Sequence, residues 1–141
     1  MNIRNKLFWL ADKLRGDIIK KHLEEIRFIN DNPNNNDAIN RRKQALSNLI
    51  AHTVSTVPYY KNLTSSAKIH DFPVVDKNTI RENIDLFISD KYSKEKLKRG
   101  QTSGSTGTPF VFYWDKNKIR RNNADTLYFW DNNGYKFGKL R

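Results

Sequence analysis

A short run of hydroxyl-bearing and glycine residues offers the clearest chemistry in this sequence. It extends from Gln101 to Pro109 and reads QTSGSTGTP. Glycine allows backbone angles with positive φ and leaves no Cβ in the way, so successive N–H groups can point into one concavity that attracts an anion. The serine and threonine hydroxyls add donors for phosphate oxygens. The run therefore predicts an anion-binding loop, and its candidate residues are Thr102, Ser103, Gly104, Ser105, Thr106, Gly107 and Thr108.

The residues around this loop exclude two common phosphate-binding motifs. A Walker A loop ends in Gly-Lys-Ser/Thr and opens a helix, whereas Gly107 is followed by Thr108, Pro109 and an alternating aromatic segment. The same arrangement excludes a dinucleotide-binding fingerprint. A Ser/Gly linker or a hairpin turn is the simpler alternative, although a generic linker is usually longer. The local residues leave a phosphate loop and a plain turn equally open.

Helices are predicted on the N-terminal side of the loop. Apolar residues recur at helical spacing on both sides of Gly16, and such a stripe either packs against its own protein, which we expect here, or lies on a membrane. Residues 31–37 form a turn-rich loop, and a helix follows over 38–55, ending before Pro58. The apolar faces of these helices are Ile3, Leu7, Leu10, Ala11 and Leu14, then Ile19, Leu23 and Ile26, then Leu46, Leu49, Ile50, Thr53 and Val54.

Shorter elements flank the loop itself. Asp76 is a good N-cap for a helix over 77–86, and the segment 92–99 is charged and shows no clear periodicity. Residues 109–114 alternate as a strand does. A last helix is predicted over 116–132, with Ala124, Leu127 and Tyr128 on its inner face, Trp130 in the core, and Gly134 at its end.

Composition narrows the possible functions. The formal net charge is +11, but basic residues are dispersed along the chain with acidic residues between them, so nucleic acid is not expected as the main partner. The absence of cysteine excludes disulfides and thiolate chemistry. Three widely spaced histidines predict no metal site. No apolar run is long enough for a signal or for crossing a bilayer, and we therefore expect a cytoplasmic chain with at most peripheral membrane contact.

The string Thr102–Pro109 resembles the phosphate loop of the adenylate-forming superfamily, which includes acyl-CoA synthetases, luciferases and the adenylation domains of peptide synthetases. The superfamily commonly has Lys after the Pro, and Phe110 departs from that pattern. This departure points to the phenylacetate–CoA ligase-like branch, which includes capsular polysaccharide biosynthesis proteins. Four further segments are similar to that branch in the same order: 7–29, 51–61, 72–77 and 134–138.

The resemblance implies an α/β fold in which a helical N-terminal region, 1–37, leads into the first strands of a large AMP-binding domain. Residues 38–141 would form the first part of that domain, which would be incomplete in this chain. The resemblance also implies a reaction of ATP, with Mg²⁺, and a carboxylic acid to give an acyl-adenylate, followed by transfer, in many members to CoA. Residues 102–108 would hold the β- and γ-phosphates. Independently of the resemblance, Lys98 and Arg99 lie just upstream of the loop and could add positive charge.

In that family the adenine contacts, the metal-binding acid and the catalytic lysine lie further downstream. We therefore expect an N-terminal portion that is inactive alone and assign it no catalytic or metal-binding residue; the remainder of the enzyme, encoded separately, would be its partner. Two other functions stay open. The chain could be a basic helical module that binds nucleic acid or an anionic membrane, or a folded interaction module without activity.

Overall fold

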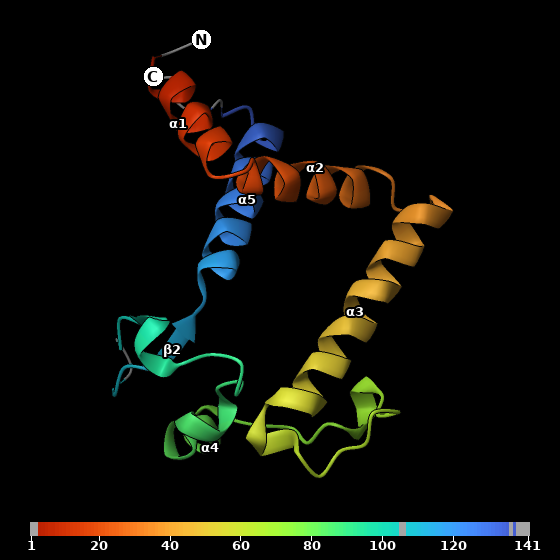
Figure 1. Ribbon diagram of the computed structural model, residues 1–141, viewed down its shortest axis with the longest axis vertical. Coiled ribbons are helices and arrows are strands. Elements are labelled where there is room, and N and C mark those ends of the chain that lie inside the picture. Colours follow the sequence, from red (N-terminus) through yellow and green to blue (C-terminus); the bar gives the residue numbers. More distant parts are fainter. Residues whose placement is uncertain (1–2, 105–106, 136, 138–141) are drawn as a thin grey trace. The chain divides into compact units, whose positions relative to one another are not determined.

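Five α-helices and one two-stranded sheet make up most of the described part of the chain. The computed structural model describes residues 3–104, 107–135 and 137. The described residues are mostly helical, and short 3₁₀ turns separate the elements in the middle of the chain. The elements are α1 (Ile3–Leu14), α2 (Ile18–Asp31), α3 (Asn36–Thr56), α4 (Lys77–Glu82), β1 (Lys98–Gln101), β2 (Val111–Trp114) and α5 (Lys116–Asn132) (Figure 1).

The chain divides into two compact units. The first comprises Met1–Arg41 and Asn117–Arg141, and the second comprises Arg42–Lys116. The last helix, which the sequence assigns to the 38–141 region, thus packs with the N-terminal helices. The division at residue 37 and the larger α/β core remain predictions, because they concern a domain of which these elements would form only a part.

The core of the first unit forms between α2 and α5. Its buried apolar side chains come from both helices, and Phe8, Trp9 and Phe137 pack against them. Polar contacts join the same two helices at the edge: Arg121 Nη1 lies 2.6 Å from Glu25 Oε2, and the Tyr128 hydroxyl donates to Asp31 at 2.9 Å. The predicted inner faces are confirmed for both helices: Ile19, Leu23 and Ile26 of α2, with Ala124, Leu127 and Tyr128 of α5.

The apolar stripe of α1 does not follow that pattern. Phe8 and Trp9 turn toward the core of the unit, but Leu7 and Leu10 on the opposite side are 58% and 53% exposed. The expectation that this stripe packs within the chain is therefore wrong for α1. The reason is that the helix uses its aromatic residues for packing, and these lie on another face from the leucines.

The apolar face of α3 is covered only in part, and the prediction that Trp130 lies in the core is wrong. Leu46 and Leu49 are exposed, whereas Ile50, Thr53 and Val54, nearer the end of the helix, are half-buried. Trp130 is 44% exposed, and its ring stacks on Phe137 at the border of the core rather than inside it.

The start of α2 is held by a side chain from the preceding helix. Asp17, the residue before α2, has a φ of 56° and makes no side-chain cap. Instead the buried carboxylate of Asp12 accepts hydrogen bonds from the N–H groups of Ile19, at 3.1 Å, and Lys20, at 3.0 Å. These N–H groups have no partner within a helix, so Asp12 both caps α2 and fixes the sharp turn after α1.

Replacing Asp12 with Ala tests this arrangement. The variant leaves two amides at the start of α2 without their acceptor, and we expect its free energy of unfolding to fall by about 1–3 kcal/mol. Urea denaturation followed by circular dichroism measures the change. The exposed Asp90 provides a control, because its replacement by Ala should alter the stability by less than about 0.5 kcal/mol. Equal unfolding curves for Asp12→Ala and the natural chain would contradict the assignment.

The second unit is organised by aromatic side chains that follow α3. The rings of Tyr59 and Phe87 stack with centroids 4.1 Å apart, and Tyr60 meets both Phe72 and Phe87 edge-on. The two tyrosines thus pack at the end of α3. Below them the buried hydroxyl of Ser89 donates to Thr56 Oγ1 at 2.9 Å. This cluster holds the end of α3 against the segment that leads from α4 to the sheet.

Candidate anion-binding site

The predicted loop connects the two strands of a β-hairpin. β1 and β2 pair antiparallel, with Lys98 opposite Trp114 and Gln101 opposite Val111. Beyond the last pair, the Thr102 N–H donates to the Phe110 carbonyl at 3.0 Å, and the Phe110 N–H donates to Thr102 Oγ1 at 3.1 Å. These bonds close the base of the loop. The hairpin connection that the residues left open is therefore present, and such a connection can still bind an anion.

β1 itself escaped the sequence analysis, which found no pattern in its segment. Its residues, Lys-Arg-Gly-Gln, lack the apolar alternation of a half-buried strand. The strand forms because it supplies backbone partners to the aromatic strand beside it. Gly100 has a specific part in this pairing: a Cβ at this position would lie only 2.4 Å from the ring of Phe112. The absence of a side chain at Gly100 thus allows the Phe112 ring to lie across β1.

The glycines shape the loop as the sequence predicts. Gly104 has a φ of +68° and Gly107 a φ of +130°. The Gly107 N–H donates to the Gly104 carbonyl at 2.9 Å, which folds the chain back on itself. A Cβ on Gly104 would lie 2.8 Å from the Gly107 oxygen and 2.9 Å from Pro109 Cγ. Because both the backbone angle and the space exclude a side chain, Gly104 is required for this conformation.

A polar hollow of about 380 Å³ lies between the loop and α4. Arg81 reaches from α4 toward the loop: its Nη1 donates to Asn78 at 2.8 Å, and its Nη2 lies 3.5 Å from the Thr108 carbonyl oxygen. Lys77, one turn earlier, lines the same hollow, which contains no acidic side chain. The lining residues are Lys77, Asn78 and Arg81 from α4, with Thr102, Ser103, Gly104, Thr108 and Phe110 from the hairpin.

The sequence does not indicate these two cations as site residues. The basic residues beside the loop in the sequence, Lys98 and Arg99, are exposed on β1 and do not line the hollow. Lys77 and Arg81 lie some 20 to 30 residues before the loop, so no local pattern links them to it. Among the described residues, neither forms an ion pair. The hollow therefore carries two positive charges that no described carboxylate neutralises.

The predicted loop residues do not all have the same role. Thr102, Ser103, Gly104 and Thr108 line the hollow, whereas Ser105 and Thr106 lie outside the described residues. Two of the amides are used within the hairpin, those of Thr102 and Gly107. The Thr102 hydroxyl accepts a bond from Phe110 and keeps its own proton to donate. Fewer backbone N–H groups are thus free to bind an anion than the sequence suggests, and the cationic side chains of Lys77 and Arg81 supplement them.

The position of α4 depends on the predicted N-cap, which is confirmed. Asp76 Oδ1 accepts from the Thr79 N–H at 2.7 Å and from the Thr79 hydroxyl at 2.8 Å. These hydrogen bonds favour the charged form and hold the pKa of Asp76 below its usual range. The α-helix ends at Glu82, and a separate 3₁₀ turn follows over Ile84–Phe87. The helix is therefore shorter than the predicted 77–86.

The described part of the chain offers no metal centre of its own. It holds no group of three or more histidine, aspartate or glutamate side chains that could bind a metal ion. The three histidines lie in different settings; His52, for example, is 3.3 Å from Thr56 Oγ1 near the end of α3. Nor does any described helix have the length and apolar character required to cross a membrane.

Comparison with known proteins shows one informative similarity. The chain is 28% identical over 148 aligned residues to Protein CapK from Staphylococcus aureus. The alignment includes all of this chain and 31% of CapK, so the chain spans about a third of the length of that curated relative. No protein-family model matches the chain, and no solved structure matches it.

The cap at Asp76 predicts a specific pH dependence for α4. The folded pKa of Asp76 lies below the unfolded value of about 4. Its contribution to stability is therefore present above that value and is lost as the pH falls through the lowered folded pKa. A carboxyl chemical-shift titration by NMR should give Asp76 a pKa below the value of the unfolded chain. Titration at or above the ordinary aspartate value would show that the cap is absent in solution.

Proposed function

We propose that this chain supplies the phosphate-binding loop of an ATP-dependent adenylate-forming ligase of the phenylacetate–CoA ligase-like branch. One observation carries the proposal: a glycine-shaped loop, matching the phosphate loop of that family, forms one wall of a hollow whose other wall carries Lys77 and Arg81. The loop and the cations come from separate parts of the second unit, and together they provide an environment for a multiply charged anion.

The chemistry of the hollow suits a pyrophosphate group. Arginine offers a planar set of donors that matches phosphate oxygens, and lysine adds a compact charge. The hydroxyls of Ser103 and Thr108 lie on the opposite wall and can donate to the same oxygens. A volume of about 380 Å³ lies within the range of small-molecule sites. Charge, donor types and size therefore all favour the β- and γ-phosphates of a nucleotide.

In an adenylation reaction, these groups would act on the leaving pyrophosphate. Negative charge grows there as the acid carboxylate attacks the α-phosphorus and the bond to the β-phosphate breaks. Fixed donors around the departing group stabilise that charge. Mg²⁺ would arrive with ATP and share in neutralising it. Lys77, Arg81 and the loop thus have a binding and electrostatic role, and the nucleophile is the carboxylate of the substrate.

The similarity to Protein CapK supports placing this activity in capsular polysaccharide biosynthesis. The sequence resemblance leads to the same branch of the superfamily, through the Phe that follows the loop in place of Lys. The carboxylic acid, and a transfer of the acyl group to CoA, belong to the whole enzyme, of which this chain would form about a third if it follows the length of CapK.

Loss of the two cations tests the proposal. We expect the natural chain to bind ATP and magnesium pyrophosphate in isothermal titration calorimetry. Lys77→Ala and Arg81→Ala should each weaken binding by about tenfold or more, because each removes a charge-assisted hydrogen bond to phosphate. The matched controls Lys61→Ala and Lys68→Ala change the net charge equally at exposed lysines outside the hollow, and they should bind as the natural chain does.

Gly104→Ala tests the loop wall of the same hollow. Its Cβ conflicts with the Gly107 oxygen and with Pro109, so the loop must change shape, and binding should weaken while the helices of the first unit keep their stability. If the natural chain binds neither ATP nor pyrophosphate, or if Lys77→Ala, Arg81→Ala and Gly104→Ala all bind as it does, the proposed function is wrong.

A further inference from the structure

We propose that α1 binds the surface of an anionic lipid bilayer through an exposed apolar stripe and the basic residues that flank it. This inference does not depend on the proposed ligase function, because it concerns the first unit only. It assigns a purpose to an apolar face of α1 that the described core of that unit leaves uncovered.

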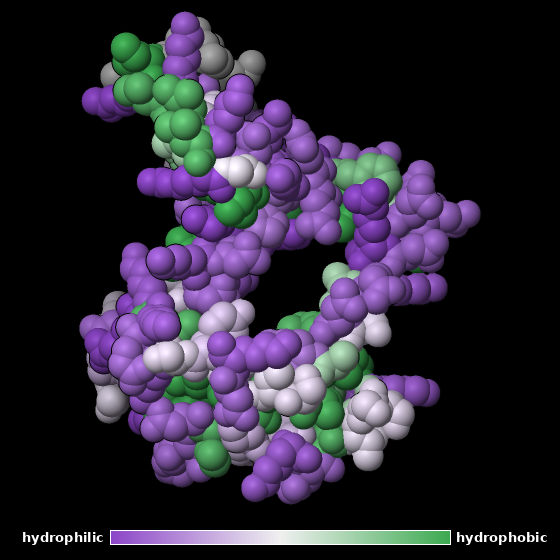
Figure 2. Space-filling view, in the orientation of Figure 1, coloured by the Kyte–Doolittle hydropathy of each residue, from purple (hydrophilic) through white to green (hydrophobic). Residues whose placement is uncertain are grey.

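The apolar stripe runs along one side of α1. Its four members are spaced by four, three and four residues, which places them on a single helix face. All four are more than half exposed, with Leu14 at 81%. Figure 2 shows this surface as apolar groups over α1, bordered by hydrophilic ones. The stripe consists of Ile3, Leu7, Leu10 and Leu14.

The charged residues beside the stripe have one sign. Lys6 and Lys13 are seven residues apart and therefore follow the same flank, while Arg4 lies toward the other flank at about 100° per residue. All three are exposed. The acidic residue of α1, Asp12, is buried on the inner side, where it caps α2. The outer surface of this helix is thus apolar along its centre and positive at its edges.

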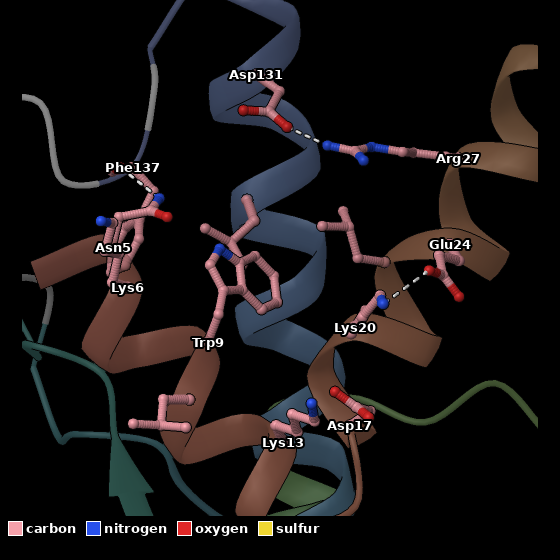
Figure 3. Close-up of a pocket in the computed structure, with 13 residues that line it drawn as sticks. Asn5, Lys6, Trp9, Lys13, Asp17, Lys20, Glu24, Arg27, Asp131 and Phe137 are labelled. Carbon is pink, nitrogen blue, oxygen red and sulfur yellow. Dashed lines mark hydrogen bonds and ion pairs between the residues drawn. The ribbon is translucent and has the colours of Figure 1, made fainter. Parts of the chain in front are cut away.

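A groove of about 850 Å³ adjoins the stripe on the side of Lys6 and Lys13, with Leu10 shared between them. Four charged residues on the far side of this groove form pairs: Lys20 lies 4.0 Å from Glu24, and Arg27 forms an ion pair with Asp131, while Asp17 also lines the groove (Figure 3). Among the described residues, Lys6 and Lys13 form no ion pair. Of the cations that line the groove, the two lysines of α1 are therefore the ones that no described carboxylate pairs with, and they are available to an external anion.

This combination selects the occupant. A second copy of the chain could cover the leucines, but it would bring the positive flanks of two α1 helices together. Nucleic acid would neutralise the flanks and leave the stripe exposed. An anionic bilayer satisfies both features, because the stripe enters the boundary between headgroups and acyl chains while the basic residues meet anionic headgroups. A helix that lies in the interface in this way needs no membrane-spanning length.

Co-sedimentation of the full chain with vesicles tests the inference. We expect binding to vesicles that contain about one third phosphatidylglycerol and little binding to pure phosphatidylcholine. Binding should weaken as salt rises, because screening shortens the reach of the surface potential. Soluble inorganic phosphate should not compete at low millimolar concentration, which distinguishes a lipid surface from a site for the free anion.

Two pairs of matched variants localise the binding. Leu7→Ser with Leu10→Ser should abolish most vesicle binding, whereas Leu46→Ser with Leu49→Ser, which changes two exposed leucines of α3, should leave it within about twofold. Lys6→Gln with Lys13→Gln should weaken binding by about tenfold or more, against about twofold for Lys43→Gln with Lys61→Gln. Because every changed side chain is exposed, circular dichroism and thermal unfolding should match those of the natural chain.

Three results would overturn the inference. The first is no binding of the natural chain to anionic vesicles at low salt. The second is equal loss of binding in the α1 and α3 variants, which would indicate a general charge or solubility effect. The third is a concentration-dependent dimer in light scattering that Leu7→Ser with Leu10→Ser abolishes while vesicle binding stays unchanged, which would assign the stripe to a second copy.

Discussion

The pairing of β1 with β2 is the constraint on which the candidate site depends. Backbone hydrogen bonds pair the charged strand β1 with β2, and Gly100 lacks the side chain that would keep the Phe112 ring from lying across β1. The pairing fixes where the loop begins and ends, and the Thr102–Phe110 bonds close it. Without that closure, the glycines would have no defined geometry in which to act, and the hollow beside α4 would lose one wall.

The other wall depends on capping rather than on a large core. α4 has only six residues and no fully buried side chain, so the hydrogen bonds from Thr79 to Asp76 matter for where it begins. A short capped helix of this kind places Lys77 and Arg81 one turn apart on the side of the loop. The first unit relies on the same device in a different form, since Asp12 caps α2 from the preceding helix. In both units, a carboxylate side chain determines where a helix starts, while basic side chains of the nearby helices stay exposed.

The chain has a net charge of +11 and dispersed basic residues, yet it still presents a distinct basic site in the hollow beside α4. Some cations are paired with carboxylates, as in the pairs of Arg27 with Asp131, Lys94 with Asp85 and Arg121 with Glu25. What distinguishes the hollow beside α4 is that two cations line it together with no acidic residue among the lining residues. Local sequence shows charge but not neighbours, and for that reason composition alone neither identifies the hollow nor separates it from the edges of α1.

Several features followed from the sequence alone. The loop between 102 and 108, the N-cap at Asp76, the inner faces of α2 and α5 and the end of α5 at Gly134 all depend on contacts within a few residues or on helical periodicity. Tertiary structure decided the rest. β1 forms only because a partner strand pairs with it. Arg81 reaches the loop across a gap of more than twenty residues, and Lys77 lines the hollow beside it. The stripe of α1 is exposed because Phe8 and Trp9, not the leucines, meet the core. Periodicity marks a face as apolar, but only the packing of other elements determines whether that face is covered.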